Sequence, residues 1–354
     1  MRDLKSLLAR TKLYIVLLLA ALTVVIWGLV LGSSPVSRDR TAVRTVIVQG
    51  SSARSIATTL QEHGLIRSPF VFVLTCTISG HSARLKPGVY ELNRAMSTPE
   101  IIKRLVEGKT LESWVTIPEG ETLREIADIL QKKRLAEPDA FLALTIDSSY
   151  RLTRTTFVYG RNLEGYLFPD TYLVERGEGA DAIVRMMLDT FRRKVVEPNR
   201  AEIRRVSRQK FGLGDDDFEL GLHKLLIVAS LIEREAKVPG DRPKISAVIW
   251  NRLAKGMKLE IDATVSYTLG ESRANKANLT YADLASASPY NTYAHAGLPV
   301  APICNPGLAS IKAALEPAPI DSLYYVAKPD GSHVFTKTLE QHNAAKQAIK
   351  DGKL

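Results

Sequence analysis

The chain has 354 residues, of which 45% are hydrophobic, and it carries a formal net charge of +10 at pH 7. That length and apolar content suffice for two or three buried cores, and the basic charge suits an anionic partner such as lipid headgroups, nucleic acid or a carboxylate-bearing polymer. No arginine-rich tract or zinc-finger spacing accompanies the charge, so we expect no nucleic-acid partner. The two cysteines, Cys76 and Cys304, lie too far apart in sequence for a metal or redox motif, and they are either buried thiols or one disulfide.

The N-terminal segment predicts a membrane anchor. Residues 13–32, LYIVLLLAALTVVIWGLVLG, carry no charge over 20 residues, enough helix to cross about 30 Å of hydrocarbon. Basic residues precede this segment, so the positive-inside rule places residues 1–12 in the cytoplasm, although three arginines also follow it. A cleaved signal peptide is the alternative, but the apolar run exceeds the usual length of its hydrophobic region. We therefore expect a transmembrane helix in contact with membrane lipid, a linker at residues 33–42, and the remaining chain outside the membrane.

After the linker the sequence repeats itself once. Residues 46–66, VIVQGSSARSIATTLQEHGLI, align with residues 116–136, TIPEGETLREIADILQKKRLA, and each copy predicts a short strand, a glycine turn and an amphipathic helix. Thr122 and Glu125 form a capping-box pattern at the start of the second helix, and Ser97 with Glu100 forms another after the strand pattern GVYEL. The matched residues are Ile47, Gly50, Ile56, Ala57, Leu60, Gln61 and Leu65 in the first copy, and Ile117, Gly120, Ile126, Ala127, Leu130, Gln131 and Leu135 in the second.

This strand–helix unit resembles the LysM module, a small fold that binds polymers of N-acetylglucosamine. We therefore assign residues 43–160 to a LysM-like α/β region containing the repeat. The alternative is a scaffold unit that contacts no glycan, because the shared motif is short.

The C-terminal region, residues 161–354, predicts a mixed α+β domain. Apolar periodicity indicates helices at about residues 180–196, 220–236 and 242–255, the last of them ended by Gly256. Residues 290–307, YNTYAHAGLPVAPICNPG, contain too much proline, glycine and asparagine for regular structure and predict a long ordered loop, which is often functional. Residues 322–336 predict a hairpin, and a final helix follows.

Two glutamates close the second of these helices, and either could be chemically special. Glu235 shares a helix face with Val228, Leu231 and Ile232, while Glu233 lies on another apolar face. A carboxyl group against an apolar wall loses hydration, which raises its pKa and lets it donate a proton near neutrality. Alternatively, Glu233 or Glu235 pairs with Arg234, Lys237 or Arg242 on a solvated helix end.

From Leu163 to His342 the sequence resembles the endolytic murein transglycosylases of the MltG, or YceG-like, family. The resemblance is carried by the segments LEGYLFPDTY, ASLIEREA, VIWNRL, GMKLEIDATVSYTLG, SPYNTY, GLPVAPICNPG and YYVAKPDGSHVFTKTLEQHN, in that order. The family usually has DPT where this chain has Asp262, Ala263 and Thr264, and GLPPGPI where it reads GLPVAPI. These departures affect loop detail and leave the acidic motif intact.

The resemblance implies a bacterial enzyme that cleaves peptidoglycan strands internally, between N-acetylmuramic acid and N-acetylglucosamine. It makes Glu235 the catalytic acid/base, and the 6-hydroxyl of the muramic acid attacks its own anomeric carbon to close a 1,6-anhydro ring. The positive charge of the transition state is stabilised either by the substrate's acetamido group or by an enzyme oxygen, for which Asp262 is a candidate. The resemblance also implies a single-pass protein of the bacterial cytoplasmic membrane, with its body outside the cytoplasm, that ends strand elongation beside peptidoglycan synthases.

Further cleft residues are expected around Glu235, because amides and hydroxyls match sugar polar groups and aromatic rings pack on pyranose faces. Alternatives remain: Asn251 and Arg252 could cap a helix end, and the tyrosines could belong to the core. We expect Glu164 and Asp170 to anchor a turn rather than to line the cleft. The expected substrate-binding residues are Asn251, Arg252, Asp262, Thr264, Tyr267, Tyr290, Asn291, Thr292 and Tyr293.

No cofactor or metal is expected, since His333 and His342 are not spaced as zinc ligands. Two other functions compete with the transglycosylase hypothesis. One is a non-catalytic scaffold that binds peptidoglycan through its LysM-like units. The other is a muramidase that uses two carboxylates and adds water.

Overall fold

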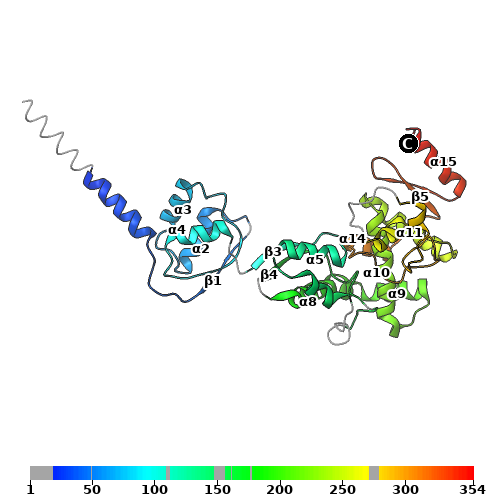
Figure 1. Ribbon diagram of the computed structural model, residues 1–354, viewed down its shortest axis with the longest axis horizontal. Helices are drawn as coiled ribbons and strands as arrows, with labels where there is room; N and C mark the ends of the chain where they lie inside the picture. Colours follow the sequence, from blue (N-terminus) through cyan, green and yellow to red (C-terminus); the bar gives the residue numbers. More distant parts are fainter. Residues whose placement is uncertain are drawn as a thin grey trace, which may run out of the picture. The chain divides into compact units, whose positions relative to one another are not determined.

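The computed structural model describes residues 19–48, 50–108, 112–146, 156–160, 162–175, 178–270 and 279–354. The chain forms two compact units that divide between Trp114 and Val115 (Figure 1). The second strand–helix copy, from Val115 onward, therefore belongs to the same unit as the C-terminal region. The architecture is mixed α+β, with three separate two-stranded sheets among the described residues.

Residues 19–33 form a helix whose apolar side chains, such as Trp27 and Val24, are exposed. Residues 1–18, which include the expected cytoplasmic segment and the first part of the expected transmembrane helix, lie outside the described residues. Within the described part of the chain, no helix combines the length and apolar character that a membrane crossing requires.

The first unit is a strand–helix–helix–strand fold with a further helix. Strand β1 (Val43–Ile47) pairs antiparallel with β2 (Gly88–Leu92), and α2 (Ala53–Glu62), α3 (Pro69–Ile78) and α4 (Thr98–Glu107) enclose a core with them. Ser52 caps α2, and the predicted Ser97–Glu100 capping box begins α4.

The second copy repeats this arrangement, and its helices lie in the second unit. Strand β3 (Glu112–Thr116) pairs with β4 (Thr171–Glu175), with α5 (Leu123–Lys132) and α6 (Pro138–Thr145) between them. Gly50 and Gly120 both have positive φ, of 84° and 83°, at equivalent turns. Only glycine adopts that conformation at little cost, which explains why both copies carry it.

Helix α10 (Phe218–Glu235) is the centre of the second unit. It packs against α9 (Glu197–Phe211), α11 (Arg242–Ala254) and α14 (Leu308–Leu315), and nearly every side chain from Leu225 to Ile232 is buried. A helix that is apolar on all sides must be enclosed on all sides, and α9, α11 and α14 are labelled around it in Figure 1.

Most predicted C-terminal elements are present. The helix expected at 180–196 is α8 (Gly179–Phe191) followed by a π-helical turn (Arg192–Val196), and the hairpin consists of β5 (Tyr324–Ala327) and β6 (His333–Thr336) before α15 (Leu339–Lys350). Helix α9 was not predicted. Its Pro198 lies in the first turn, where the missing N–H is tolerated, although proline in sequence reads as a helix stop. The shorter helices α12 (Asp262–Thr268), α13 (Tyr281–Leu284) and α14 were also missed.

Asn305, in the predicted loop, connects three segments through its fully buried side chain. Its Oδ1 accepts hydrogen bonds from Gly165 N at 3.0 Å and Leu167 N at 2.9 Å. Its Nδ2 donates to the carbonyl oxygen of Glu121 and to Oε1 of Glu164, both at 3.0 Å. One amide thus satisfies polar groups that would otherwise be buried without partners.

The same loop is bonded to α10. Ile303 N donates to Ser230 Oγ at 3.1 Å, and Gly307 N donates to Glu233 Oε2 at 3.0 Å. Residues 303–307 therefore join the second strand–helix copy to the central helix.

Both cysteines are free and buried. Burial raises the pKa of Cys76 to about 11, so this thiol is protonated at neutral pH. The alternative of a disulfide between Cys76 and Cys304 is wrong for this structure.

We predict that Asn305→Ala lowers the free energy of unfolding by about 3 kcal/mol or more, because it leaves two buried N–H groups without acceptors. Urea denaturation of the full chain measures this. The control Asn199→Ala removes one amide that bonds the Val195 carbonyl within a helix, and it should cost less than about 1 kcal/mol. Equal losses for the two variants would contradict the role given to Asn305.

Candidate active site

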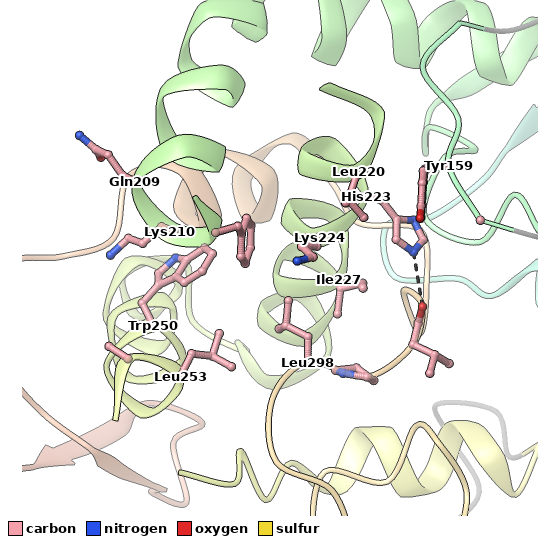
Figure 2. Close-up of a pocket in the computed structure, with 15 residues that line it drawn as sticks. Tyr159, Gln209, Lys210, Leu220, His223, Lys224, Ile227, Trp250, Leu253 and Leu298 are labelled. Carbon is pink, nitrogen blue, oxygen red and sulfur yellow. Dashed lines mark hydrogen bonds between the residues drawn. The ribbon is translucent and has the colours of Figure 1, made fainter. Parts of the chain in front are cut away.

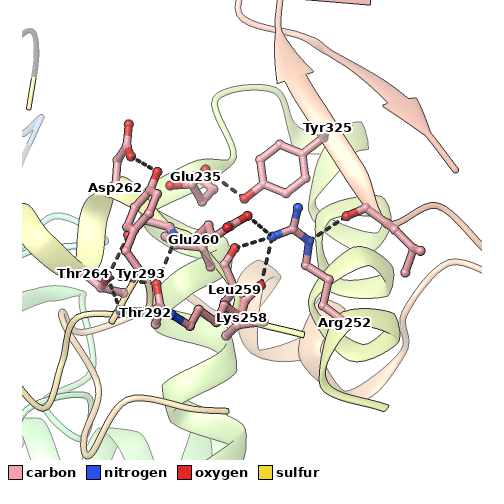
Figure 3. Close-up of polar contacts among 12 residues, drawn as sticks. Glu235, Arg252, Lys258, Leu259, Glu260, Asp262, Thr264, Thr292, Tyr293 and Tyr325 are labelled. Carbon is pink, nitrogen blue, oxygen red and sulfur yellow. Dashed lines mark hydrogen bonds and ion pairs between the residues drawn. The ribbon is translucent and has the colours of Figure 1, made fainter. Parts of the chain in front are cut away.

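Glu235 is the last residue of α10 and lines a cavity of about 460 Å³. The backbone turns extended at Ala236, so the carboxyl group lies where the apolar helix ends. Tyr325, on β5, donates a hydrogen bond from Oη to Glu235 Oε2 at 2.9 Å (Figure 3). The side chain is accessible from the cavity but enclosed elsewhere by protein.

This enclosure raises the pKa of Glu235 to about 7. Loss of hydration is the main cause, and the negative charge of Asp262 adds to it. The Tyr325 hydrogen bond and the positive charge of Arg234 lower the pKa and so oppose these effects. A carboxyl group with this pKa is partly protonated at neutral pH and can both donate and accept a proton.

Asp262 faces the same cavity from the first position of α12. Tyr293 donates a hydrogen bond from Oη to Asp262 Oδ1 at 2.5 Å (Figure 3). Burial, together with this carboxylate, raises the pKa of the Tyr293 hydroxyl, which stays a donor over the physiological range. Asp262 itself is exposed to solvent, in contrast to the desolvated Glu235 in the same cavity.

Arg252 lines the cavity but is largely engaged by the protein. Its guanidinium donates to the carbonyl oxygens of Leu323, Lys258 and Leu259 and to Glu260 Oε2, at 2.6 to 3.0 Å (Figure 3). Glu260 has a φ of 55°, which is unfavourable for a side chain of this kind. Strain of this sort is retained where surrounding contacts hold it, often at a functional site.

Three other expected residues do not line the cavity but hold segments that carry its lining residues. Thr264 and Thr292 are buried, with their hydroxyl oxygens 3.1 Å apart, and Thr292 Oγ1 accepts from Ile261 N at 2.9 Å. Asn291 is also buried and donates to the carbonyl oxygens of residues 284 and 286. These contacts hold the start of α12 against the loop that carries Tyr293.

Tyr267 and Tyr290 lie at a different cavity, of about 520 Å³. Their ring centroids are 5.0 Å apart, and Tyr267 Oη donates to Glu164 Oε2 at 3.1 Å. Burial raises the pKa of Glu164 to about 8, although hydrogen bonds from Leu123 N and Tyr267 oppose the shift. Glu164 therefore holds the start of α5 as well as a turn, and it borders this second cavity.

Asn251 lies outside both cavities. Its Nδ2 donates to the carbonyl oxygens of Ile320 and Ser322 at 2.9 and 3.0 Å, so it holds the chain that leads into β5. Of the expected residues, the structure brings Glu235, Arg252, Asp262 and Tyr293 to one cavity.

A third cavity, of about 690 Å³, lies along the first half of α10 (Figure 2). It is lined mainly by apolar side chains, among them Leu220, Ile227, Trp250 and Leu253. Its buried His223 has a pKa lowered by burial. The cavity contains no carboxyl group and is not the site of the acid chemistry.

Comparison with known proteins decides the family. Residues 45–348 match the model of the YceG-like family. This chain belongs to the YceG-like family. An endolytic murein transglycosylase from Bacillus subtilis is 36% identical over 88% of this chain and 86% of its own length. One from Streptococcus pneumoniae is 29% identical over 84% of this chain, which spans 56% of that protein. A crystal structure of a yceG-like protein from Listeria monocytogenes has a TM-score of 0.52 and 35% identity, and covers 87% of this chain and 100% of that one.

The cavity of this YceG-like protein contains residues that sequence reasoning missed. Tyr325 is the main one, and Glu260, Tyr324, His342 and Lys346 also line the cavity. The hairpin carrying Tyr325 was predicted, but nothing in its spacing indicates contact with a residue 90 positions earlier. Among the described residues, no group of three His, Cys, Asp or Glu side chains could hold a metal ion.

We predict that Tyr325→Phe raises the pKa of Glu235 above about 7, because the lost hydrogen bond stabilises the carboxylate. Carbon-13 NMR of glutamate-labelled protein, titrated with pH and assigned with Glu235→Gln, measures the pKa. Tyr324→Phe is the matched control from the same strand and should leave the pKa unchanged. A fall in pKa in Tyr325→Phe would contradict the assignment.

Proposed function

We propose that this YceG-like protein is an endolytic lytic transglycosylase that cleaves peptidoglycan between N-acetylmuramic acid and N-acetylglucosamine. The observation that carries the proposal is the desolvated Glu235, which lines an open cavity and has a pKa of about 7. The transglycosylase names of the Bacillus and Streptococcus relatives support the substrate.

In the proposed reaction, protonated Glu235 donates its proton to the glycosidic oxygen as the bond to the anomeric carbon breaks. N-acetylglucosamine leaves with that proton. The 6-hydroxyl oxygen of the same muramic acid then bonds to the anomeric carbon, and its proton returns to Glu235. Water is not consumed, and the strand ends in a 1,6-anhydro ring.

The surrounding residues support both steps. Tyr325 fixes the orientation of the Glu235 carboxyl through its 2.9 Å hydrogen bond. Asp262, held by Tyr293, presents a negative charge that can stabilise the oxocarbenium-like transition state. A single desolvated acid fits this reaction, because no second residue has to activate water.

We further propose that residues 13–32 anchor the protein in the bacterial cytoplasmic membrane with the two units outside the cytoplasm. Support comes from the uncharged sequence of that segment, the basic residues before it and the exposed apolar side chains of residues 19–33. An enzyme anchored there acts on nascent strands, near the peptidoglycan synthases that make them. The strand–helix copies are proposed as LysM-like glycan-binding units, on the basis of their repeated motif.

Glu235→Gln should lower strand cleavage by about 10²–10⁴-fold or more, since the amide keeps the shape but cannot donate the proton. Release of soluble fragments from purified peptidoglycan measures this. Glu219→Gln, in the first turn of the same helix, is the control and should retain activity. Thermal unfolding by circular dichroism verifies that both variants fold, and a folded, active Glu235→Gln would overturn the proposal.

The products should end in 1,6-anhydro-muramic acid and should contain no added water. Mass spectrometry of digests made in ¹⁸O-labelled water distinguishes the outcomes. Reducing ends that carry the label would instead identify a muramidase.

A further inference from the structure

One face of α15 borders the Glu235 cavity. Leu339, His342, Asn343 and Lys346 all line it, and their spacing of three, four and seven residues places them on the same side of the helix. The C-terminal helix thus forms a wall of the cavity.

The cavity is lined by charged groups of both signs. Glu235, Glu260 and Asp262 supply acidic groups, and a substrate carboxylate would be repelled by them. Arg252 is engaged by Glu260 and by backbone carbonyl groups. In the part of the chain that the structure describes, Lys346 makes no ion pair, so its ammonium group at the rim can bind an anion.

His342 adds a neutral polar group beside this ammonium. Its ring stacks on Tyr324, with centroids 5.5 Å apart. Its Nδ1 is buried and has no hydrogen-bond partner among the described residues. Burial and the nearby cations lower the pKa of His342, so the imidazole is uncharged at pH 7.

We propose that Lys346, with His342 beside it, binds a carboxylate carried on the lactyl arm of the substrate's muramic acid. This inference rests on the proposed function, because the arm is the anionic part of that substrate. The carboxylate belongs either to the lactyl group itself, in strands without peptides, or to the stem peptide attached to it.

Such a contact would orient the strand. A carboxylate held at Lys346 fixes which sugar occupies the position next to Glu235. The enzyme would then select muramic acid, and not N-acetylglucosamine, as the sugar whose anomeric carbon reacts.

Ligand binding by a variant that cannot cleave the strand tests the role of Lys346 separately from catalysis. In the full chain carrying Glu235→Gln, we would measure the affinity for three muramic-acid-containing tetrasaccharides. One carries stem peptides, one carries free lactyl carboxylates, and one carries lactyl groups converted to neutral methylamides. The same affinities are then measured after adding Lys346→Ala or Lys346→Arg. The control is Lys350→Ala, which lies on the same helix but outside the cavity.

Lys346→Ala should weaken binding of at least one anionic ligand about two- to fivefold, as expected for one charge contact at an exposed site. It should leave the neutral ligand unaffected. Lys346→Arg should retain most of the affinity, and Lys350→Ala should retain all of it. Loss with the peptide ligand alone identifies the stem-peptide carboxylate, and loss with the free-lactyl ligand identifies the lactyl group.

Equal weakening for all three ligands, or no weakening for any, would overturn the inference. Failure of the proposed function has a different signature, because the wild-type chain would then form no 1,6-anhydro ends whatever Lys346 binds.

Discussion

The hydrogen bonds made by residues 303–307 are the constraint on which the second unit depends. These residues are irregular and buried, so their backbone groups need partners. On one side Ser230 and Glu233 of α10 provide them, and on the other Asn305 binds Glu164 and the backbone around Gly165. The central helix, the second strand–helix copy and the turn before β4 are therefore positioned together, and the end of α10 is fixed with them.

Glu233 and Glu235 show how one helix end can use two acids differently. Glu233 has a structural role, since its carboxylate accepts a hydrogen bond from Gly307 N and lies 3.6 Å from the guanidinium of Arg242. Glu235 is rotated about 200° around the helix and meets a tyrosine hydroxyl, an open cavity and another acid. Environment, and not residue type, separates the supporting acid from the one proposed to react.

Sequence patterns predicted the parts of this protein that depend on local order. The repeated strand–helix units, α10, α11, the hairpin and α15 follow from periodicity, caps and turns. Contacts between distant residues did not follow. Tyr267 and Tyr290 lie with Glu164 instead of Glu235, and the hydroxyl that binds Glu235 comes from a strand near the end of the chain. The spacing of residues along a sequence does not predict which distant side chains come into contact. Only the family resemblance could therefore rank Glu235 above Glu233 as the catalytic candidate.

The two desolvated acids also connect protonation to folding. Glu235 and Glu164 have folded-state pKa values of about 7 and about 8, above their ordinary value of 4.5. Between pH 4.5 and the folded-state pKa, each carboxyl group keeps a proton in the folded chain that it has released in the unfolded chain. A rise in pH through this range therefore favours unfolding at these two sites. Their contribution to stability is greatest below about pH 4.5 and declines as the pH rises toward 8. Mild acidity therefore strengthens the contribution of these two sites to folding.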